Sequence, residues 1–244
     1  MESDRLLAKS WNEKIGGPAP PHIFLPQHLR DVYSAADRVL SATAAEQLAA
    51  LGLEPRLHLE RFRRIVLLAA AVHDLGKAND HFQGMISGRR DVREQPQGLR
   101  HEWVAVLMLR RLWEWILPAA GSNETDLAIA EWAVAGHHPA VNHASPPKAI
   151  PSNGAPGPQI RLFMGHPDFR QALLWLHERF GLGTPPPLSD QTCELVGLQS
   201  IFDVELARWS RSSQLHWEKL RRSADRFLVA AVKDCLTLQR TLLV

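Results

Sequence analysis

The chain has little of what secreted and membrane proteins require. Its two cysteines, Cys193 and Cys235, stand far apart without a CxxC pair, so neither a disulfide framework nor a zinc knuckle is expected. The first residues, Met1 to Asp4, are acidic and lack the apolar region of a secretory signal. No run of about 18 apolar residues is present that could cross a bilayer. A reduced, cytoplasmic protein with no membrane partner is therefore expected.

An excess of charge of one sign is also missing. The chain has 28 Lys and Arg against 26 Asp and Glu, a net charge of +2, so no strongly basic total indicates nucleic acid. Local arginine clusters, such as those at residues 61–64 and 89–93, could hold phosphates or could be solvated helix faces. The composition alone leaves both interpretations open.

Strand signals are scarce as well, because alternating β-branched runs are nearly absent while apolar residues recur at helical spacing. The hydrophobic content, 45% of 244 residues, can build a full core. The sequence therefore predicts an all-α helical bundle in a single domain, 1–244, loop-rich over 1–26 and with long loops near 87–99 and 139–167. The expected helices cover residues 27–51, 59–74, 78–84, 101–117, from Asn123 or Thr125 to 136, 168–180, 191–209 and 213–240.

One of these helices ends in an unusual pair. The apolar run 65–72 stops at His73 and Asp74, with Lys77 shortly after. Neighbouring helical residues point about 100° apart, so His73 and Asp74 can reach one point only where the helix ends. A carboxylate there can bridge two divalent ions, as in two-metal hydrolysis. Lys77 is then a candidate to stabilise developing negative charge, or simply a cation near the helix C-terminus.

Further candidate ligands follow in order along the chain. His101 opens a helix, and His137 and His138 close another just before a proline, where packing hardly explains two imidazoles. Asp225 is a carboxylate within an apolar stripe, which is costly to bury unless it is paired or bound to metal. His28 precedes them all. Each residue alone is typical of a cap or surface group, but the ordered series indicates a metal site.

The donor atoms of this series restrict the chemistry. All are nitrogen or oxygen, which favours manganese, iron, cobalt, nickel or magnesium over a cysteine-bound structural zinc. Two such ions a few Å apart activate water and hold a phosphoryl oxygen, so hydrolysis of a phosphate ester is predicted. The substrate could be DNA, or a nucleotide or cyclic nucleotide. A non-catalytic binding module is a third possibility, against which the complete ligand set argues.

Several short strings resemble the HD nuclease of type I CRISPR interference, a branch of the HD phosphohydrolase superfamily. The resemblance runs from residue 7 to about residue 230, nearly the whole chain. It rests on Leu7-Ala8-Lys9-Ser10, Gln27-His28-Leu29-Arg30-Asp31-Val32, His73-Asp74-Leu75-Gly76-Lys77 followed by Phe82-Gln83, Arg100-His101-Glu102 and Gly136-His137-His138.

The resemblance implies metal-dependent cleavage of single-stranded DNA that an RNA-guided surveillance complex has opened. It also implies a superfamily 2 helicase, fused or separate. This chain has no GxxxxGK[ST] motif of its own, so it is not expected to power translocation itself. Pro139 departs from the small residue frequent after the His pair, and Asp234 is a rival to Asp225. By the resemblance, one ion would be held by His28, His73, Asp74 and Asp225, and the second by Asp74, His101, His137 and His138.

Overall fold

Helices dominate the described part of the chain, which in this computed structural model comprises residues 5–11, 16–88, 100–138 and 159–194. The all-α prediction is confirmed there, apart from one pair of short strands. No helix of these ranges is long and apolar enough to cross a membrane. The elements are η2 (Pro21–Ile23), α2 (Leu25–Ala50), α3 (Pro55–Val72), η3 (Leu75–Lys77), α4 (Asp80–Ile86), α5 (His101–Arg111), α6 (Trp113–Ile116), η4 (Leu117–Ala120), α7 (Glu124–Gly136), β1 (Gln159–Leu162), α8 (Pro167–Phe180) and β2 (Gln191–Glu194).

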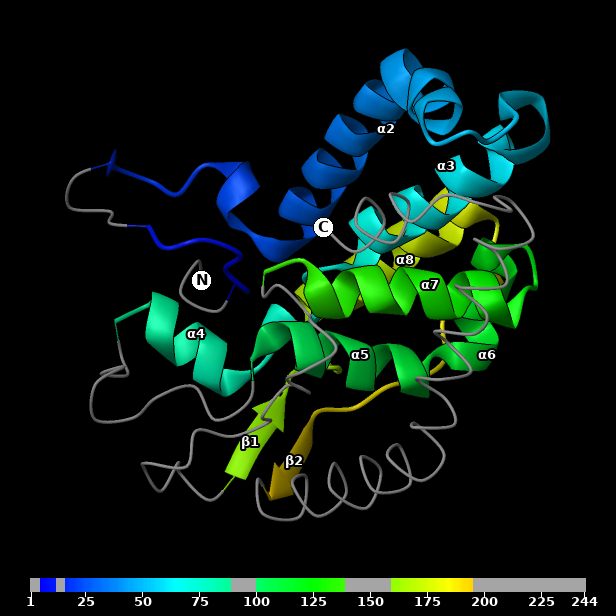
Figure 1. Cartoon of the computed structure of the whole chain (residues 1–244). Coiled ribbons are helices and arrows are strands. Elements are labelled where there is room, and N and C mark those ends of the chain that lie inside the picture. The colour runs from blue at the N-terminus through cyan, green and yellow to red at the C-terminus, as the bar shows by residue number, and fades with distance from the viewer. Residues whose placement is uncertain (1–4, 12–15, 89–99, 139–158, 195–244) are drawn as a thin grey trace, which may run out of the picture.

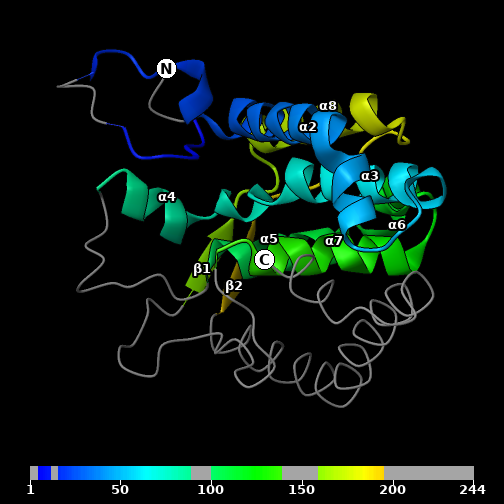
Figure 2. The same ribbon diagram turned by 45° about the horizontal axis from the view of Figure 1, so that its top comes forward.

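The main helices stack in layers (Figures 1 and 2). Helix α3 packs against α2 on one side and α7 on the other, α8 contacts α2, and α5 lies beside α7. Apolar residues at helical spacing on α3, such as Ile65, Leu68 and Val72, are all buried in the core between the layers. The middle helix α3 thus ends inside the protein, with the ends of other helices around it.

Helix boundaries follow from local capping. The side chain of Asn123 accepts hydrogen bonds from the backbone N–H groups of Thr125 and Asp126, so α7 begins at Glu124. Helix α2 ends two residues before Gly52, which has a φ of +73°, a conformation that suits glycine. These two boundaries match the predicted stop and start signals.

Some predicted boundaries are wrong. The segment expected to be helical over 191–209 begins as strand β2, and the expected loop 139–167 contains strand β1. The two strands pair antiparallel, and burial of Ile160 and Leu162 around an exposed Arg161 gives the alternation of a strand over only four residues. The helix expected over 101–117 is interrupted at Leu112, where α5 ends, and is followed by α6 up to Ile116 and then η4.

The N-terminal expectation also needs correction, because the loop-rich segment 1–26 already contains η2 and the start of α2. The rest of the expected loops, 89–99 and 139–158, lies outside the described residues. So do residues 195–209 and the expected helix 213–240. A single domain over 1–244 therefore stays a prediction.

The arginine cluster at 61–64 serves the fold. Arg61 and Arg64 of α3 bind the buried carboxylate of Asp126 at the start of α7, at 2.6 and 3.3 Å. Arg63 binds Asp37 of α2 at 2.6 Å. The three guanidinium groups therefore connect α3 to the neighbouring helices α2 and α7. Ion pairs within the fold account for these arginines, and not phosphate binding or a solvated helix face, the two interpretations that the sequence left open.

Candidate metal centre

Four helix termini converge on the carboxylate of Asp74. This residue follows His73, the C-cap of α3, and is 2% exposed. The residues around it are His28 in the first turn of α2, His73 at the end of α3, His101 at the start of α5, and His137 and His138 after α7.

The way α3 ends explains how two adjacent residues reach one point. His73 still has helical angles, φ −52° and ψ −38°, while Asp74 leaves the helix at φ −106° and ψ 9°. Nε2 of His73 consequently lies 3.0 Å from Oδ2 of Asp74. The sequence argument that both side chains can meet only at a helix end describes this geometry.

The two oxygens of Asp74 face different sets of imidazoles. Oδ2 lies 2.9 Å from Nε2 of His28 and 3.0 Å from Nε2 of His73. Oδ1 lies 3.3 Å from Nε2 of His101 and 3.4 Å from Nε2 of His137. Each side forms a group whose ligand atoms all lie within 4.8 Å of one another: His28, His73 and Asp74 on one side, and Asp74, His101, His137 and His138 on the other.

The hydrogen bonds of two imidazoles leave their Nε2 atoms facing Asp74, an arrangement that suits a cation between the ring and the carboxylate. Nδ1 of His73 donates to the carbonyl of Ala70, and Nδ1 of His137 donates to the carbonyl of Val134. In the neutral rings, Nε2 therefore carries a lone pair that points at a carboxylate oxygen, which is repulsive. Burial alone would lower the pKa of His137, but its hydrogen bond with Asp74 raises it, so a proton on the ring can remove this repulsion. A divalent cation between the two atoms would remove it as well, by binding both.

The case for a bound cation is strongest on the Oδ1 side of Asp74, where buried polar atoms have no other partner in the described part of the chain. Oδ1 of Asp74 and Nε2 of His101 and of His137 are buried atoms without a hydrogen-bond partner among the described residues. Atoms that bind one ion at about 2.1 Å lie about 3.0–3.4 Å apart when they are neighbours in its coordination shell. The observed N···O distances of 3.3 and 3.4 Å fit that spacing. The donor set therefore fits a divalent ion.

Electrostatics favour the same state. Burial alone would raise the pKa of Asp74, but the imidazoles that surround the carboxylate, His101 and His137 above all, hold that pKa well below the ordinary value. Burial, with the nearby charge of His137 and His101, lowers the pKa of His138. An ionised carboxylate beside a neutral imidazole is what a metal ion requires.

The other predicted site residue, Lys77, lies in the same place. Its side chain is nearly buried, and Nζ is 2.6 Å from Oδ2 of Asp74 and donates to the backbone carbonyl of Ala8 at 3.0 Å. The ammonium thus neutralises one oxygen of the carboxylate. The sequence did not predict that Ala8 holds the Lys77 ammonium, because the contact is made by a backbone carbonyl, which every residue has.

Glu102 supports His101 from behind. Its fully buried side chain accepts from Arg100 at 2.7 and 3.1 Å, and its other oxygen lies 3.4 Å from Nδ1 of His101. Burial would raise the pKa of Glu102, but Arg100 and His101 outweigh it and lower that pKa. An ionised carboxylate behind a ligating imidazole orients the ring toward its ion. Asp225 and its rival Asp234 lie outside the described residues, so their place in the site stays a prediction.

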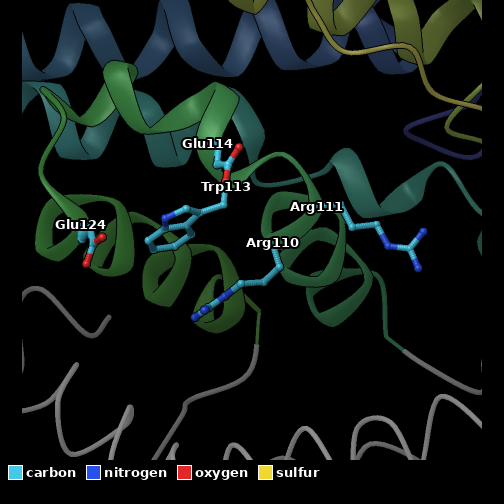
Figure 3. A pocket seen from close by; sticks show the side chains of 5 residues that line it. All are labelled: Arg110, Arg111, Trp113, Glu114 and Glu124. Carbon is cyan, nitrogen blue, oxygen red and sulfur yellow. The ribbon is translucent and has the colours of Figure 1, made fainter.

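A cavity of about 530 Å³ lies elsewhere, lined by residues at the far ends of α5 and α7 and in α6 (Figure 3). Its aromatic wall is Trp113, with the guanidinium of Arg110 5.0 Å from the ring centroid. His101 begins α5, whereas Arg110 and Arg111 end it, so this cavity is separate from the Asp74 centre.

A His-Asp pair at a helix end, surrounded by histidines from other helices, defines an HD-type metal-binding domain. The family described as "Cas3, HD domain" matches residues 8–236, and this chain belongs to that family. A CRISPR-associated nuclease/helicase Cas3 of Myxococcus xanthus (strain DK1622) is 37% identical over 187 residues. That match covers 75% of this chain and 23% of the relative, so the chain spans about a quarter of the relative's length. No solved structure matches the chain. The resemblance to the HD nucleases of CRISPR interference is confirmed.

Proposed function

We propose that this chain is a metal-dependent DNA nuclease, which hydrolyses phosphodiester bonds of target DNA at the Asp74 centre in type I CRISPR defence. The observation that carries the proposal is the division of Asp74, with Oδ2 facing His28 and His73 and Oδ1 facing His101 and His137. One carboxylate between two sets of ligands is the arrangement of two-metal phosphodiester hydrolysis.

The ligands divide accordingly. The Oδ2 side would hold one divalent ion together with Asp225, and the Oδ1 side would hold the second. Nitrogen and oxygen donors suit manganese, nickel, cobalt, iron or magnesium. Such ions, when bound, activate water and neutralise charge on phosphoryl oxygens. The residues assigned as ligands are His28, His73, Asp74, His101, His137, His138 and Asp225.

Lys77 would act beside the ligands. Its contacts with Asp74 and the carbonyl of Ala8 use two of the three N–H bonds of its ammonium. We assign the third N–H to a phosphate oxygen of the substrate, where it stabilises the charge that develops as the phosphodiester bond breaks.

The substrate we propose is single-stranded DNA, because the chain has no Walker A motif with which to open a duplex itself. A superfamily 2 helicase, fused or separate, would supply the single strand, and an RNA-guided surveillance complex would select it. The name of the Myxococcus relative, which joins a nuclease to a helicase, supports this pairing.

The test is cleavage of circular single-stranded DNA, which has no ends, by the wild type with manganese, nickel or magnesium, and with a chelator. We expect cleavage with at least one metal, no cleavage with the chelator, and loss of cleavage in Asp74→Asn. Asp37→Asn is the matched control, because Asp37 forms a surface ion pair with Arg63. Absence of cleavage with every metal, together with hydrolysis of a nucleotide or cyclic nucleotide, would overturn the proposal.

A further inference from the structure

The ammonium of Lys77 is held by a backbone carbonyl from a distant part of the chain. Ala8, whose carbonyl accepts from Nζ at 3.0 Å, belongs to a short extended segment, residues 5–8, that we call the N-terminal strap. The strap is 69 residues from Lys77 in sequence, so its own position must be fixed by other contacts.

Gln83 of α4 connects the strap to the turn that carries Lys77. Its side-chain oxygen accepts from the N–H of Leu7 at 2.9 Å, and its side-chain nitrogen donates to the carbonyls of Leu7 at 2.8 Å and Lys77 at 2.9 Å. Gln83 is 5% exposed, and its hydrogen bond to the carbonyl of Lys77 is buried while the two to Leu7 are partly buried. A single amide therefore binds both backbone segments that meet at the Lys77 ammonium.

The rest of the strap is anchored on two other helices. The N–H of Ala8 donates to the carbonyl of Ile23 at 2.7 Å, just before α2. At the other end of the strap, Asp168 of α8 accepts from Nε of Arg5 at 2.8 Å and from the N–H of Leu6 at 2.7 Å. These hydrogen bonds hold the strap against α2 and α8, and Gln83 sets the position of the strap relative to the turn that carries Lys77.

We propose that Gln83 is a positioning residue for Lys77: by clamping the N-terminal strap to the Lys77 turn, it keeps the Ala8 carbonyl where it directs the ammonium onto Oδ2 of Asp74. The cleavage arm of the test rests on the proposed nuclease function. A second arm measures the position of the Lys77 side chain directly and does not require any enzymatic activity.

The direct measurement is the rate at which a lysine-acetylating reagent modifies Lys77, followed by mass spectrometry of the whole chain. Lys9 is exposed and serves as an internal reference in the same spectra. Gln83→Met keeps the length of the side chain and removes its hydrogen bonds. We expect acetylation of Lys77 to rise about tenfold in Gln83→Met, a factor that corresponds to losing hydrogen bonds around a buried cation. Gln47→Met, on α2, is the matched control and should leave the rate unchanged.

The second measurement is a double-mutant cycle in DNA cleavage. If Gln83 acts through Lys77, the substitution Gln83→Met should slow cleavage about tenfold when Lys77 is present. The same substitution should have almost no further effect on cleavage in a chain that already carries Lys77→Met. A merely structural role of Gln83 would instead slow both backgrounds by the same factor, and that result would overturn the proposal.

Asp168→Asn provides a second variant should Gln83→Met fail to fold, because it loosens the same strap from the α8 side. It should raise the acetylation of Lys77 in the same direction. An unchanged rate in every folded variant of Gln83 and Asp168 would overturn the positioning role. If the wild type cleaves no DNA at all, the nuclease proposal fails, and the acetylation rates still decide the role of Gln83.

Discussion

The backbone of Gly76 lies directly against the backbone of His101. A Cβ atom at Gly76 would come within 1.9 Å of the carbonyl oxygen of His101 and 2.3 Å of the amide nitrogen of Ala105. Both are backbone atoms of α5, which cannot turn aside as a side chain can. The absence of a side chain at Gly76 therefore sets how closely His101 approaches Asp74, two residues earlier in the chain.

Gly76→Ala should consequently damage both stability and the metal site. Overpacking against backbone costs about 1–3 kcal/mol or more, so we expect the free energy of unfolding to fall by at least about 2 kcal/mol. We also expect weaker manganese binding, because α5 must carry His101 away from Asp74. Denaturant unfolding and calorimetric titration measure the two effects. Gly183→Ala, where a Cβ meets nothing within 4 Å, is the control. Equal stability and metal affinity in both variants would contradict this account.

The two sides of Asp74 should bind ions with unequal affinity. The Oδ1 side offers four ligand atoms among the described residues, whereas the Oδ2 side offers three and already has the Lys77 ammonium at 2.6 Å. Titration with manganese should therefore show a tighter and a weaker event. His137→Ala should remove the tighter event and His28→Ala the weaker one. His22→Ala, at an exposed position, should change neither. Loss of the same event in both site variants would show that the two sides do not bind separately.

Lys77→Met should change metal binding and catalysis in opposite directions. Removing a positive charge next to Oδ2 should raise the affinity of the weaker ion by roughly tenfold. The same change removes the N–H group that we assign to the substrate, so DNA cleavage should fall. Calorimetric titration and cleavage of circular DNA measure the two effects on the same preparation. A variant with weaker metal binding would show that Lys77 chiefly holds Asp74 in place.

Much of the site could be predicted from the sequence because its residues lie at helix ends. Apolar residues recur at helical spacing on α3, α5 and α7, and this pattern shows where each helix begins or ends. The pattern ends just before His73 and His137 and begins at His101. Helix ends in a bundle gather at few places, so an ordered series of such residues indicates one site.

Other features could not be predicted, since they depend on contacts between distant segments. Strands β1 and β2 have four residues each and pair across about thirty residues of chain, which no local pattern reveals. The Ala8 carbonyl and the tight contact at Gly76 are backbone features, and composition does not report them. The split of Asp74 between two imidazole sets requires atomic positions, although the resemblance implied the same grouping.

Glu102 should control how firmly His101 binds its ion. Glu102→Gln removes the negative charge 3.4 Å from Nδ1 of His101 while keeping the shape of the side chain. Losing a carboxylate behind a ligating imidazole typically lowers metal affinity about 10- to 100-fold. Manganese titration of Glu102→Gln against Glu124→Gln, whose site is exposed, measures the effect. An affinity equal to that of the control would mean that packing alone orients His101.

Glu131 gives the stability of the fold a pH dependence of its own. This carboxyl of α7 is 3% exposed, and burial raises its pKa to about 7, although Arg110 at 3.1 Å opposes the rise. The ordinary value is 4.5, so between pH 4.5 and 7 the folded chain keeps a proton that the unfolded chain has lost. The free energy of unfolding should therefore fall as pH rises through this window, by up to about 3 kcal/mol from this group.

The variant Glu131→Gln isolates that contribution, because a neutral amide has no proton to lose at either pH. Urea unfolding at pH 5 and pH 8 should show that Glu131→Gln gains stability relative to the wild type at pH 8, by up to about 3 kcal/mol, and that most of this gain disappears at pH 5. The histidines titrate in both proteins, so their effect cancels in the difference. Glu114→Gln, at an exposed position, should give a difference from the wild type that does not vary with pH. A constant difference for Glu131→Gln as well would show that Glu131 stays ionised in the fold, with Arg110 compensating fully for its burial.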